Sequence, residues 1–436
     1  MPIRILRTEA ASFGTAFTAL RHWDFSDDGV VNRQAKLVLD AVRGEGDAAL
    51  LRYTAQFDGV EAASVSELTM TRDALQAVLE AIPEPQRQAL ATAAGRVRDY
   101  HARQVLPAFE FTDSLGNRLG QRVGALERVG VYVPGGRAAY PSTVLMTVIP
   151  ARVAGVDDIT MVVPTPRGER NALVLAAAAL AGVDRVHCVG GAQAIAALAY
   201  GTESIARVDK IVGPGGAYVA AAKRLVYGQV GIDMIAGPSE VVVVADGSTP
   251  ADWTALDLFS QAEHDEVAQA ILITPDAAYD EAVRAACERL LPAQPRAAII
   301  RASLEGRGAI IVTPTLEVAL EVANAIAPEH LELALADARA WLPSVRHAGA
   351  VFLGGRSSES IGDYVAGPSH VLPTFGTARF SSPLSVYDFQ KRMSVIEVSA
   401  EGADVLGRVA ATLADGEGLD AHAAAARARI GTGQNP

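Results

Sequence analysis

From about residue 128 onward, short runs of β-branched residues alternate with alanine-rich stretches, and this alternation constrains the fold more than any other feature of the chain. The first four predicted strands cover residues 129–133, 159–163, 186–189 and 210–212. All four are too apolar to face water on one side. Such strands are typical of parallel sheets buried between two helix layers. The pattern therefore predicts one α/β unit over residues 129–239.

A second alternating set follows and predicts a second sheet of the same kind. Its strands are expected at residues 241–245, 270–274, 309–312 and 350–353. Helices are expected between them at residues 253–264, 279–290 and 316–326. The fold class that we predict is therefore α/β, with two tandem doubly wound, incomplete Rossmann-like domains and small helical extensions at both ends.

The domain boundaries follow from where the alternation starts and stops. Residues 1–25 are predicted to form an N-terminal extension, and residues 129–239 the first α/β domain. Residues 26–128 show mostly helical patterns, at 31–57, 71–82 and 85–106, and we expect them to complete the second domain together with residues 240–382. Residues 383–436 are predicted to form a C-terminal helical extension.

Composition and charge exclude several classes of protein. The 436 residues carry a net charge of −12 and no dense run of lysine or arginine, which argues against a nucleic-acid partner. Two cysteines, Cys188 and Cys287, cannot form a disulfide framework or a thiolate-rich zinc site. The start of the chain does not read as a signal peptide. Its longest apolar run, 172–183, is shorter than the ~20 residues that span a bilayer. We expect a cytoplasmic protein with no membrane partner.

Three glycine-rich turns follow predicted strands, although the G-x-G-x-x-G pattern of dinucleotide-binding folds is absent. They are Pro134-Gly135-Gly136, Gly190-Gly191-Ala192-Gln193 and Gly213-Pro214-Gly215-Gly216. Glycine lets a ligand approach the backbone, and the start of the following helix favours an anion. Three turns along one sheet edge are typical of a nucleotide site. Tight structural turns remain the alternative interpretation.

Histidines and carboxylates in the last part of the chain raise the question of a metal site. His264 follows Gln261 by three residues, so both can face one object from the same side of a helix. His370 lies in a turn-rich stretch after Asp363, and His422 lies near the C-terminus. Imidazole, carboxylate and amide groups are suitable ligands for zinc or a similar divalent ion. The spacing matches no short zinc motif, and structural or surface histidines remain an alternative for each.

Glu329 and His330 are adjacent, just after the helix predicted at residues 316–326. An adjacent carboxyl and imidazole can supply two proton-transfer groups. The alternative is a helix C-terminus with a favourable imidazolium.

Several blocks, in this order, resemble the histidinol dehydrogenase family over residues 30 to the C-terminus. The blocks are Ile232-Asp233-Met234-Ile235-Ala236-Gly237-Pro238-Ser239-Glu240, Gln261-Ala262-Glu263-His264, Ala327-Pro328-Glu329-His330, Gly367-Pro368-Ser369-His370-Val371-Leu372-Pro373, Ser385-Val386-Tyr387-Asp388-Phe389 and Glu417-Gly418-Leu419 followed by His422. The order and number of the blocks make this resemblance specific.

The resemblance implies one zinc ion per subunit and a homodimer with shared active sites. The implied zinc ligands are Gln261, His264, Asp363 and His422, with His422 supplied by the partner subunit. It also implies two NAD-linked oxidations that convert L-histidinol through L-histidinaldehyde to L-histidine, the last steps of histidine biosynthesis. His330 would act as the base on the alcohol, and Glu329 would activate water for attack on the aldehyde.

The resemblance further assigns binding residues for substrate and cofactor. The implied substrate-binding residues are Ser239, Gln261, His264, His330, Asp363, His370, Glu417 and His422, with Glu417 facing the substrate ammonium. Tyr132, Gln193 and the position of Gly216 would line the NAD site. The chain departs from the family at Gly216 and Thr147, where the family commonly has asparagine. The contact that asparagine makes to the cofactor at the first position is therefore absent here.

Three alternatives stay open at this stage. Relatives of this family oxidise other alcohols, including sulfonated diols, with the same metal and the same Glu-His pair. A zinc hydrolase would use Glu329 as the general base on a metal-bound water. A non-catalytic small-molecule binder would use the same scaffold without needing that pair.

Overall fold

The computed structural model describes residues 3–23, 29–135 and 140–431. Gly136, the last residue of the first glycine turn, lies outside these ranges. The chain divides into two compact units. Unit 1 contains residues 1–104 and 127–388, and unit 2 contains residues 105–126 and 389–436.

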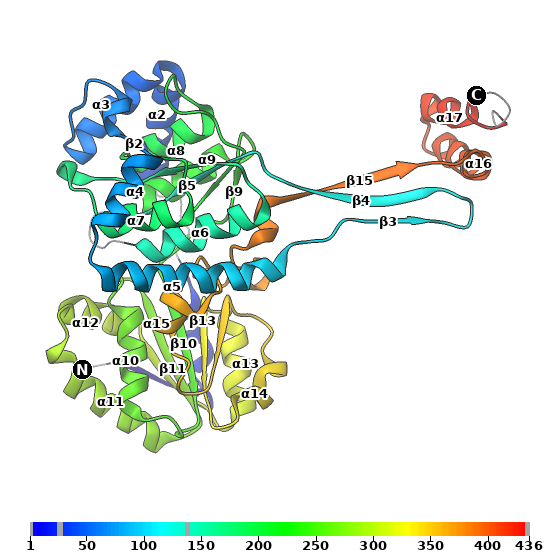
Figure 1. Ribbon diagram of the computed structural model, residues 1–436. Helices are drawn as coiled ribbons and strands as arrows, with labels where there is room; N and C mark the ends of the chain where they lie inside the picture. Colours follow the sequence, from blue (N-terminus) through cyan, green and yellow to red (C-terminus); the bar gives the residue numbers. More distant parts are fainter. Residues whose placement is uncertain (1–2, 24–28, 136–139, 432–436) are drawn as a thin grey trace. The chain divides into compact units, whose positions relative to one another are not determined.

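The first sheet of unit 1 has six strands in the order β2-β7-β6-β5-β8-β9 (Figure 1). Their bounds are β2 Thr69–Thr71, β7 Arg185–His187, β6 Asp158–Val162, β5 Arg128–Tyr132, β8 Lys210–Val212 and β9 Gly231–Ile232. All neighbours pair in parallel except β2 and β7, which are antiparallel. Its helices are α2 Gly29–Glu45, α3 Asp47–Asp58, α4 Arg72–Ala81, α5 Glu84–His101, α6 Pro141–Ala154, α7 Ala172–Ala181, α8 Gly191–Tyr200 and α9 Ala217–Val226.

The second sheet has six parallel strands in the order β1-β12-β11-β10-β13-β14. Their bounds are β1 Arg4–Arg7, β12 Ala309–Val312, β11 Gln269–Thr274, β10 Glu240–Ala245, β13 His330–Ala334 and β14 Ala350–Leu353. Side chains of α10 Ala251–Ala262, α11 Ala277–Leu290 and α12 Ala297–Gly306 pack into one core cluster. Side chains of α1 Phe13–Arg21, α13 Leu316–Ile326 and α14 Ala338–Trp341 pack into the cluster on the other face. The predicted α/β class with two doubly wound sheets is confirmed.

The structure corrects the assignment of residues 26–128. We grouped this segment with the second sheet, but β2 pairs with β7 of the first sheet, and Val38 and Leu50 belong to the core that contains Val162. The helices α2, α3, α4 and α5 pack against α6, α7, α8 and α9. An amphipathic helix shows that it has a buried face but not which sheet that face covers. The predicted N-terminal extension also contributes strand β1 to the second sheet.

Strand β13 was not predicted, although it lies inside the second sheet between β10 and β14. Its sequence is His-Leu-Glu-Leu-Ala, and all five side chains are buried. Two titratable residues in five hide the apolar run that marks a buried strand. The alternative reading of Glu329 and His330 as a helix end is therefore wrong, because His330 opens a strand.

Unit 2 has an antiparallel sheet in the order β15-β4-β3 and two helices. The elements are β3 Phe109–Thr112, β4 Arg118–Ala125, β15 Gln390–Glu397, α16 Ala400–Gly416 and α17 Asp420–Arg427. The C-terminal extension is thus not purely helical, because β15 pairs with a hairpin from residues 109–125. Within the described part of unit 2, the hydrophobic cluster of buried residues consists of Ala411, Ala414 and Ala423.

A search of the described helices finds none that combines the length and the hydropathy required to cross a lipid bilayer.

Candidate active site

A cavity of about 730 Å³ lies between the two sheets of unit 1. From the first sheet, the loops that follow the carboxyl ends of β8 and β9 line it, at Gly213–Ala217 and Asp233–Ser239. From the second sheet, residues at the amino ends of β10 and β13 and the loop before β11 line it. The volume lies within the ~300–1,000 Å³ that small-molecule sites typically have.

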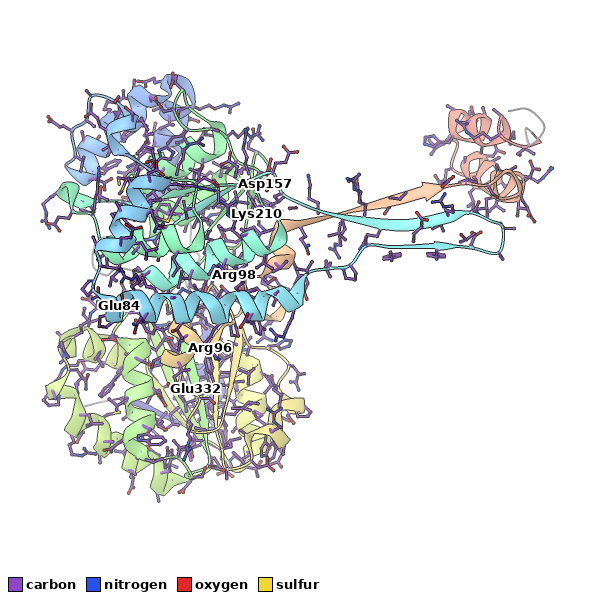
Figure 2. The ribbon with its side chains drawn as sticks, viewed as in Figure 1. Glu84, Arg96, Arg98, Asp157, Lys210 and Glu332 are labelled. Atoms are coloured by element: carbon purple, nitrogen blue, oxygen red, sulfur yellow. The ribbon has the colours of Figure 1, made fainter. Side chains whose placement is uncertain are left out.

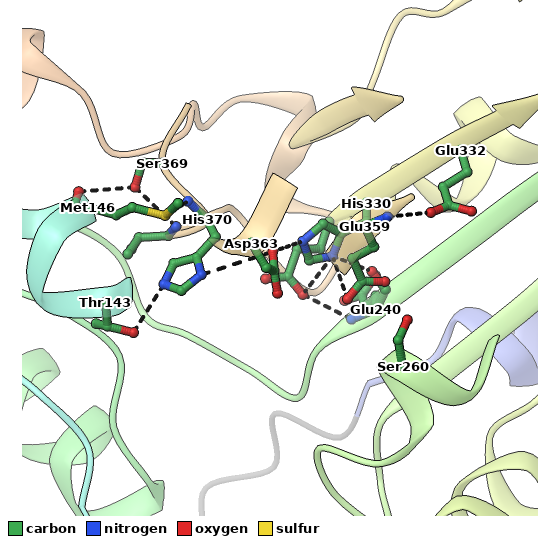
Figure 3. A network of polar contacts seen from close by, with 12 residues as sticks. Thr143, Met146, Glu240, Ser260, His330, Glu332, Glu359, Asp363, Ser369 and His370 are labelled. Carbon is green, nitrogen blue, oxygen red and sulfur yellow. Dashed lines mark hydrogen bonds and ion pairs between the residues drawn. The ribbon is translucent and has the colours of Figure 1, made fainter. Parts of the chain in front are cut away.

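Glu329 and His330 lie at the amino end of β13, beside the first residue of β10. The backbone N of Glu240 donates to Glu329 Oε2 at 2.9 Å. His330 Nδ1 donates to the backbone O of Glu240 at 3.0 Å (Figure 3). The carboxyl and imidazole are 3.7 Å apart and almost fully buried. With Nδ1 donating, His330 Nε2 remains available to exchange a proton, and it lies 3.4 Å from Asp363 Oδ1.

Burial and neighbouring charges set the acidity of this pair. Burial raises the pKa of Glu329 to about 7, although His330 and the Glu240 amide oppose the shift. Burial alone lowers the pKa of His330, but the carboxylates of Glu359, Glu329 and Asp363 together raise it well above its ordinary value. A carboxyl group with a pKa near neutrality is suited to general base catalysis.

Asp363 lies on the π-helical turn Gly362–Ala366, which follows the short helix α15 Glu359–Ile361. Single π-turns are frequent at functional sites. Arg96 of α5 holds the turn by donating to the backbone O of Val365 at 2.7 Å and of Ala366 at 3.1 Å (Figure 2). Burial raises the pKa of Asp363, but His330, His370 and His264 together lower it below its ordinary value, which keeps this carboxylate ionised.

A group of metal-type ligands lies next to the proton-transfer pair. Ligand atoms of His264, Glu359 and Asp363 all lie within 4.8 Å of one another. Gln261 faces the same group, because its amide nitrogen, once the amide is oriented correctly, donates to Glu359 Oε1 at 2.8 Å and Oε2 at 3.2 Å. That orientation leaves the amide oxygen of Gln261 as the atom available to a metal.

His370 and Ser239 line the same cavity. His370 Nε2 hydrogen-bonds Thr143 Oγ1 of α6 at 3.0 Å, and its Nδ1 lies 4.0 Å from Asp363 Oδ1. Burial lowers the pKa of His370, so its ring is neutral at physiological pH. Ser239 is half-buried, immediately before β10. The structure therefore brings together all the predicted site residues that belong to the second domain.

The predicted cofactor residues lie at the carboxyl edge of the first sheet. The hydroxyl of Tyr132 accepts from the backbone N of Gly191 at 3.2 Å, and burial raises the pKa of Tyr132 to about 12. Gln193 is 1 % exposed, and neither of its amide atoms has a hydrogen-bond partner among the described residues. Neither side chain lines the cavity, whereas Gly213 and Gly216 do.

A buried ion pair holds the glycine turn after β8. The backbone N of Gly213 donates to Asp233 Oδ2 at 2.6 Å, and Lys223 Nζ donates to the backbone O of Gly213 at 2.9 Å. Lys223 and Asp233 also pair directly, with both side chains almost fully buried. Gly213 has φ +108°, and a Cβ there would meet Tyr132 O at 2.1 Å. Gly216 is exposed, with open space around a Cβ at that position.

Glu417 and His422, the remaining predicted site residues, belong to unit 2. Glu417 follows α16 and His422 lies on α17, and both side chains are exposed.

The sequence analysis did not identify two buried acids in this site. Glu359 contacts Gln261 and lies 4.0 Å from His330 Nδ1, and burial raises its pKa to about 8. Glu240 contacts Glu329, His330 and Phe375. Glu240 could have been found from the sequence, because it ends the conspicuous Gly-Pro-Ser-Glu stretch. Glu359 lies in Ser-Glu-Ser, which has no distinguishing pattern.

Comparison with known proteins identifies the family of this chain. A family model described as histidinol dehydrogenase matches residues 24–430. The chain belongs to the histidinol dehydrogenase family. A histidinol dehydrogenase from Pseudomonas aeruginosa is 59% identical over 98% of both chains, and one from Dechloromonas aromatica is 57% identical over 98% of this chain and 99% of the relative. The crystal structure of histidinol dehydrogenase from Elizabethkingia anophelis has a TM-score of 0.92, with 34% identity and 98% of each chain covered.

The family resemblance drawn from the sequence blocks is thus confirmed over nearly the whole chain. Histidinol dehydrogenases are oxidoreductases of histidine biosynthesis, and the two-sheet architecture is shared with a solved member of the family.

Proposed function

We propose that this protein is a zinc-dependent histidinol dehydrogenase that converts L-histidinol through L-histidinaldehyde to L-histidine with two NAD as hydride acceptors. The observation that carries the proposal is the Glu329–His330 pair, buried at 3.7 Å beside His264, Glu359 and Asp363 in one cavity. A dehydrogenase that performs two oxidations needs a base for the alcohol and a second base for water. The pair supplies both.

The residues present fit a zinc ion. His264, Asp363 and the amide oxygen of Gln261 would be the ligands from this chain, and Glu359 would orient Gln261 through its hydrogen bonds. Burial lowers the pKa of His264, which keeps the imidazole in the neutral form that binds metal. Gln261 and His264 also lie at the C-terminal end of α10, where the helix dipole favours a cation. Bound zinc would supply Lewis-acid charge that holds and orients the imidazole and amine of the substrate.

The first sheet fits an anionic cofactor. Gly213-Pro214-Gly215-Gly216 precedes the N-terminus of α9, where exposed backbone N–H groups favour phosphate. Tyr132 and Gln193 lie at the neighbouring strand ends, and the unpaired amide of Gln193 is a candidate contact for the cofactor. NAD would supply the hydride acceptor for both steps.

In the alcohol step, the neutral form of His330 takes the hydroxyl proton at Nε2 while hydride leaves the carbinol carbon. The carboxylates of Glu359, Glu329 and Asp363, which raise the pKa of His330, stabilise the imidazolium that forms. The hydrogen bond from Nδ1 to Glu240 O fixes the ring and leaves Nε2 directed at the cavity. In the aldehyde step, Glu329 takes a proton from the water that attacks the carbonyl. Its pKa of about 7 lets it accept that proton near neutral pH. The burial of Glu329 and His330 keeps bulk water away from the aldehyde.

A homodimer would complete the site, with Glu417 and His422 supplied by the partner subunit. Unit 2 supports this proposal, because its core consists of small alanines while many large apolar side chains are exposed. These exposed residues are Phe109, Phe111, Met393, Val395, Ile396, Val398, Val405, Leu406, Val409, Leu413 and Leu419. A surface of this kind typically marks an interface between proteins. Glu417 would then pair with the substrate amine, which favours an amino alcohol over a sulfonated diol.

The test is to incubate the purified zinc-loaded protein with NAD and L-histidinol and to measure NADH and L-histidine. Two NADH per histidine are expected, and a chelator should abolish turnover. A Glu329→Gln protein serves as the matched control for the second step. Oxidation of a sulfonated diol but not of L-histidinol would overturn the substrate assignment, and hydrolytic turnover without NAD would overturn the reaction class.

A further inference from the structure

Glu240, the first residue of β10, contacts both proton-transfer residues, Glu329 and His330. Its backbone N donates to Glu329 Oε2 at 2.9 Å, and its backbone O accepts from His330 Nδ1 at 3.0 Å. One residue of β10 therefore holds both side chains that the proposed mechanism uses. The position of that peptide sets the direction of the Glu329 carboxyl and of the His330 ring.

The side chain of Glu240 holds a second part of the wall. Its Oε1 accepts from the backbone N of Phe375 at 2.5 Å, and the side chain is 1 % exposed. Phe375 has φ +60°, a left-handed conformation that a bulky residue adopts only when its surroundings enforce it. Its ring packs on Gly237, where a Cβ would lie 2.0 Å from a ring carbon. Phe375 and Gly237 both line the cavity.

A second hydrogen bond joins the segment of Phe375 to the segment of Gly237. The backbone N of Gly237 donates to Thr374 Oγ1 at 2.8 Å, which ties the segment before β10 to the segment of Phe375. Trp23 packs edge-on against Phe375 at 5.0 Å, and the Arg307 guanidinium lies over the Trp23 ring at 4.0 Å. The Glu240 side chain, which is 1 % exposed, thus lies against the Phe375 backbone and is not among the described residues that line the cavity.

Three residues bring charges to face Glu240: Glu329 just before β13, His330 at the start of β13, and Arg307 after α12. Burial raises the pKa of Glu240 to about 8, the Glu329 charge adds to the rise, and the Phe375 amide, Arg307 and His330 oppose it. The carboxyl is therefore protonated near neutral pH. In that form it puts no negative charge beside Glu329, and an amide of the same shape can replace it.

We propose that Glu240 is a positioning residue of the active site: its carboxyl group holds the Phe375 backbone and thereby keeps the Glu240 peptide in the place that aligns Glu329 and His330. This proposal rests on the function proposed above. Glu240 touches no substrate in it and acts through the two residues that its backbone holds. Its side chain links the proton-transfer pair to the wall that closes the cavity.

The variants Glu240→Gln and Glu240→Met separate positioning from packing. Glutamine keeps an oxygen that accepts from Phe375 N, whereas methionine has a similar shape and no such acceptor. Gln269→Met is the matched control, because Gln269 pairs with Glu240 in register on β11, is equally buried, and donates to Leu20 O and Arg307 O rather than to the catalytic pair. Zinc-loaded proteins are assayed for kcat and KM with histidinol and with histidinaldehyde from pH 6 to about pH 10, and for thermal unfolding.

We expect Glu240→Met to lower kcat for both steps about 10–100-fold, as displaced catalytic groups do, with little change in KM. Glu240→Gln should restore most of kcat and should move or remove the change in kcat that the wild type shows as Glu240 ionises above pH 8. Gln269→Met should lose comparable stability and keep kcat.

Equal kcat losses in Glu240→Met and Gln269→Met would overturn the proposal, as would a Glu240→Gln protein as slow as Glu240→Met. If Glu240→Met does not fold, an alkaline kcat limb in Glu240→Gln identical to that of the wild type overturns it. A wild-type protein that does not oxidise histidinol would instead overturn the proposed function.

Discussion

The two sheets of unit 1 meet one cavity through opposite edges. The first sheet faces it with the carboxyl ends of its strands, at Gly213 and Asp233, and the second with amino ends, at Ser239 and His330. Ligands of open α/β sheets usually bind at carboxyl ends. The first sheet follows this rule, and the second departs from it.

The difference between the edges is electrostatic. Helix α9 begins at the first edge, so its N-terminus presents N–H groups and a partial positive charge. Helices α10 and α13 end at the second edge, just before His264 and Glu329, so their C-termini present carbonyl groups and a partial negative charge. An anionic dinucleotide suits the first edge, and a metal cation with its proton-transfer residues suits the second. One layered scaffold thus offers two kinds of binding surface.

The largest expected effect comes from the second edge. Glu329→Gln should slow histidinaldehyde oxidation by about 10²–10⁴-fold, the usual contribution of a general base, because an amide cannot take the proton of the attacking water. Oxidation of histidinol to the aldehyde, followed by single-turnover NADH formation, should fall much less, since His330 serves that step. Equal losses in both steps would contradict the separate roles.

Zinc should stabilise the folded protein only through ligands at the amino edge of the second sheet. At a zinc concentration 100 times Kd, zinc should add about 2.7 kcal/mol to the free energy of unfolding, which thermal melts with and without zinc will measure. Asp363→Ala should remove this stabilisation and the bound metal found by elemental analysis. Arg72→Ala, on the first sheet's helix α4, is the control and should leave both unchanged. A zinc response that survives in Asp363→Ala would refute the assigned ligand set.

Two glycine-to-alanine substitutions test whether the carboxyl edge of the first sheet binds the cofactor. Gly213→Ala should cost about 1–3 kcal/mol of backbone strain and raise the KM for NAD, because Gly213 has φ +108° and a Cβ would strike Tyr132 O. Gly182→Ala is its matched control, since Gly182 also has a positive φ (+87°) but does not line the cavity, and we expect a loss of stability without a change in the KM for NAD. If Gly213→Ala raises the KM for histidinol instead of that for NAD, the turn does not serve the cofactor.

The smallest predicted effect is a pH dependence. Burial raises the pKa of Glu329 to about 7, so its base form is lost as pH falls through 7. The kcat of aldehyde oxidation should therefore fall about fivefold between pH 7 and pH 6, as the fraction of Glu329 in its base form declines from about one half to about one tenth. The sign is opposite for a group that must be protonated, so a rate that rises on acidification would exclude Glu329 as the base.

Much of the architecture could be predicted because burial leaves a periodic signal. Strands β8, β12 and β14 and helix α13 have the bounds that alternation of apolar runs indicated. Strand β13 escaped because His330 and Glu332 interrupt its apolar pattern. The hairpin of β3 and β4 escaped as well, because its strands are largely exposed and lack a continuous apolar run.

The site could be predicted only in part from the residues themselves. Gln261 and His264 share a helix end, and Glu329 and His330 are adjacent, so local spacing placed each pair. Joining the two pairs to Asp363 and His370 required blocks shared with a family, because no local rule spans a hundred residues. Glu359 carried no signal of its own, since a buried acid in a short helix looks like any surface acid, and the signal for Glu240 was limited to its place at the end of the Gly-Pro-Ser-Glu stretch.

By itself, the sequence determined most strands and helices of the two parallel sheets, because apolar periodicity reflects burial. It also determined the family, because several motifs occur in the family's order. Only the tertiary structure decided which sheet the helices of residues 26–128 cover, since an amphipathic sequence shows that a helix face is buried but not what it packs against. It also decided that His264, Glu359 and Asp363 converge beside Glu329 and His330. That convergence depends on helices and loops returning to the amino edge of the second sheet, which long-range packing sets.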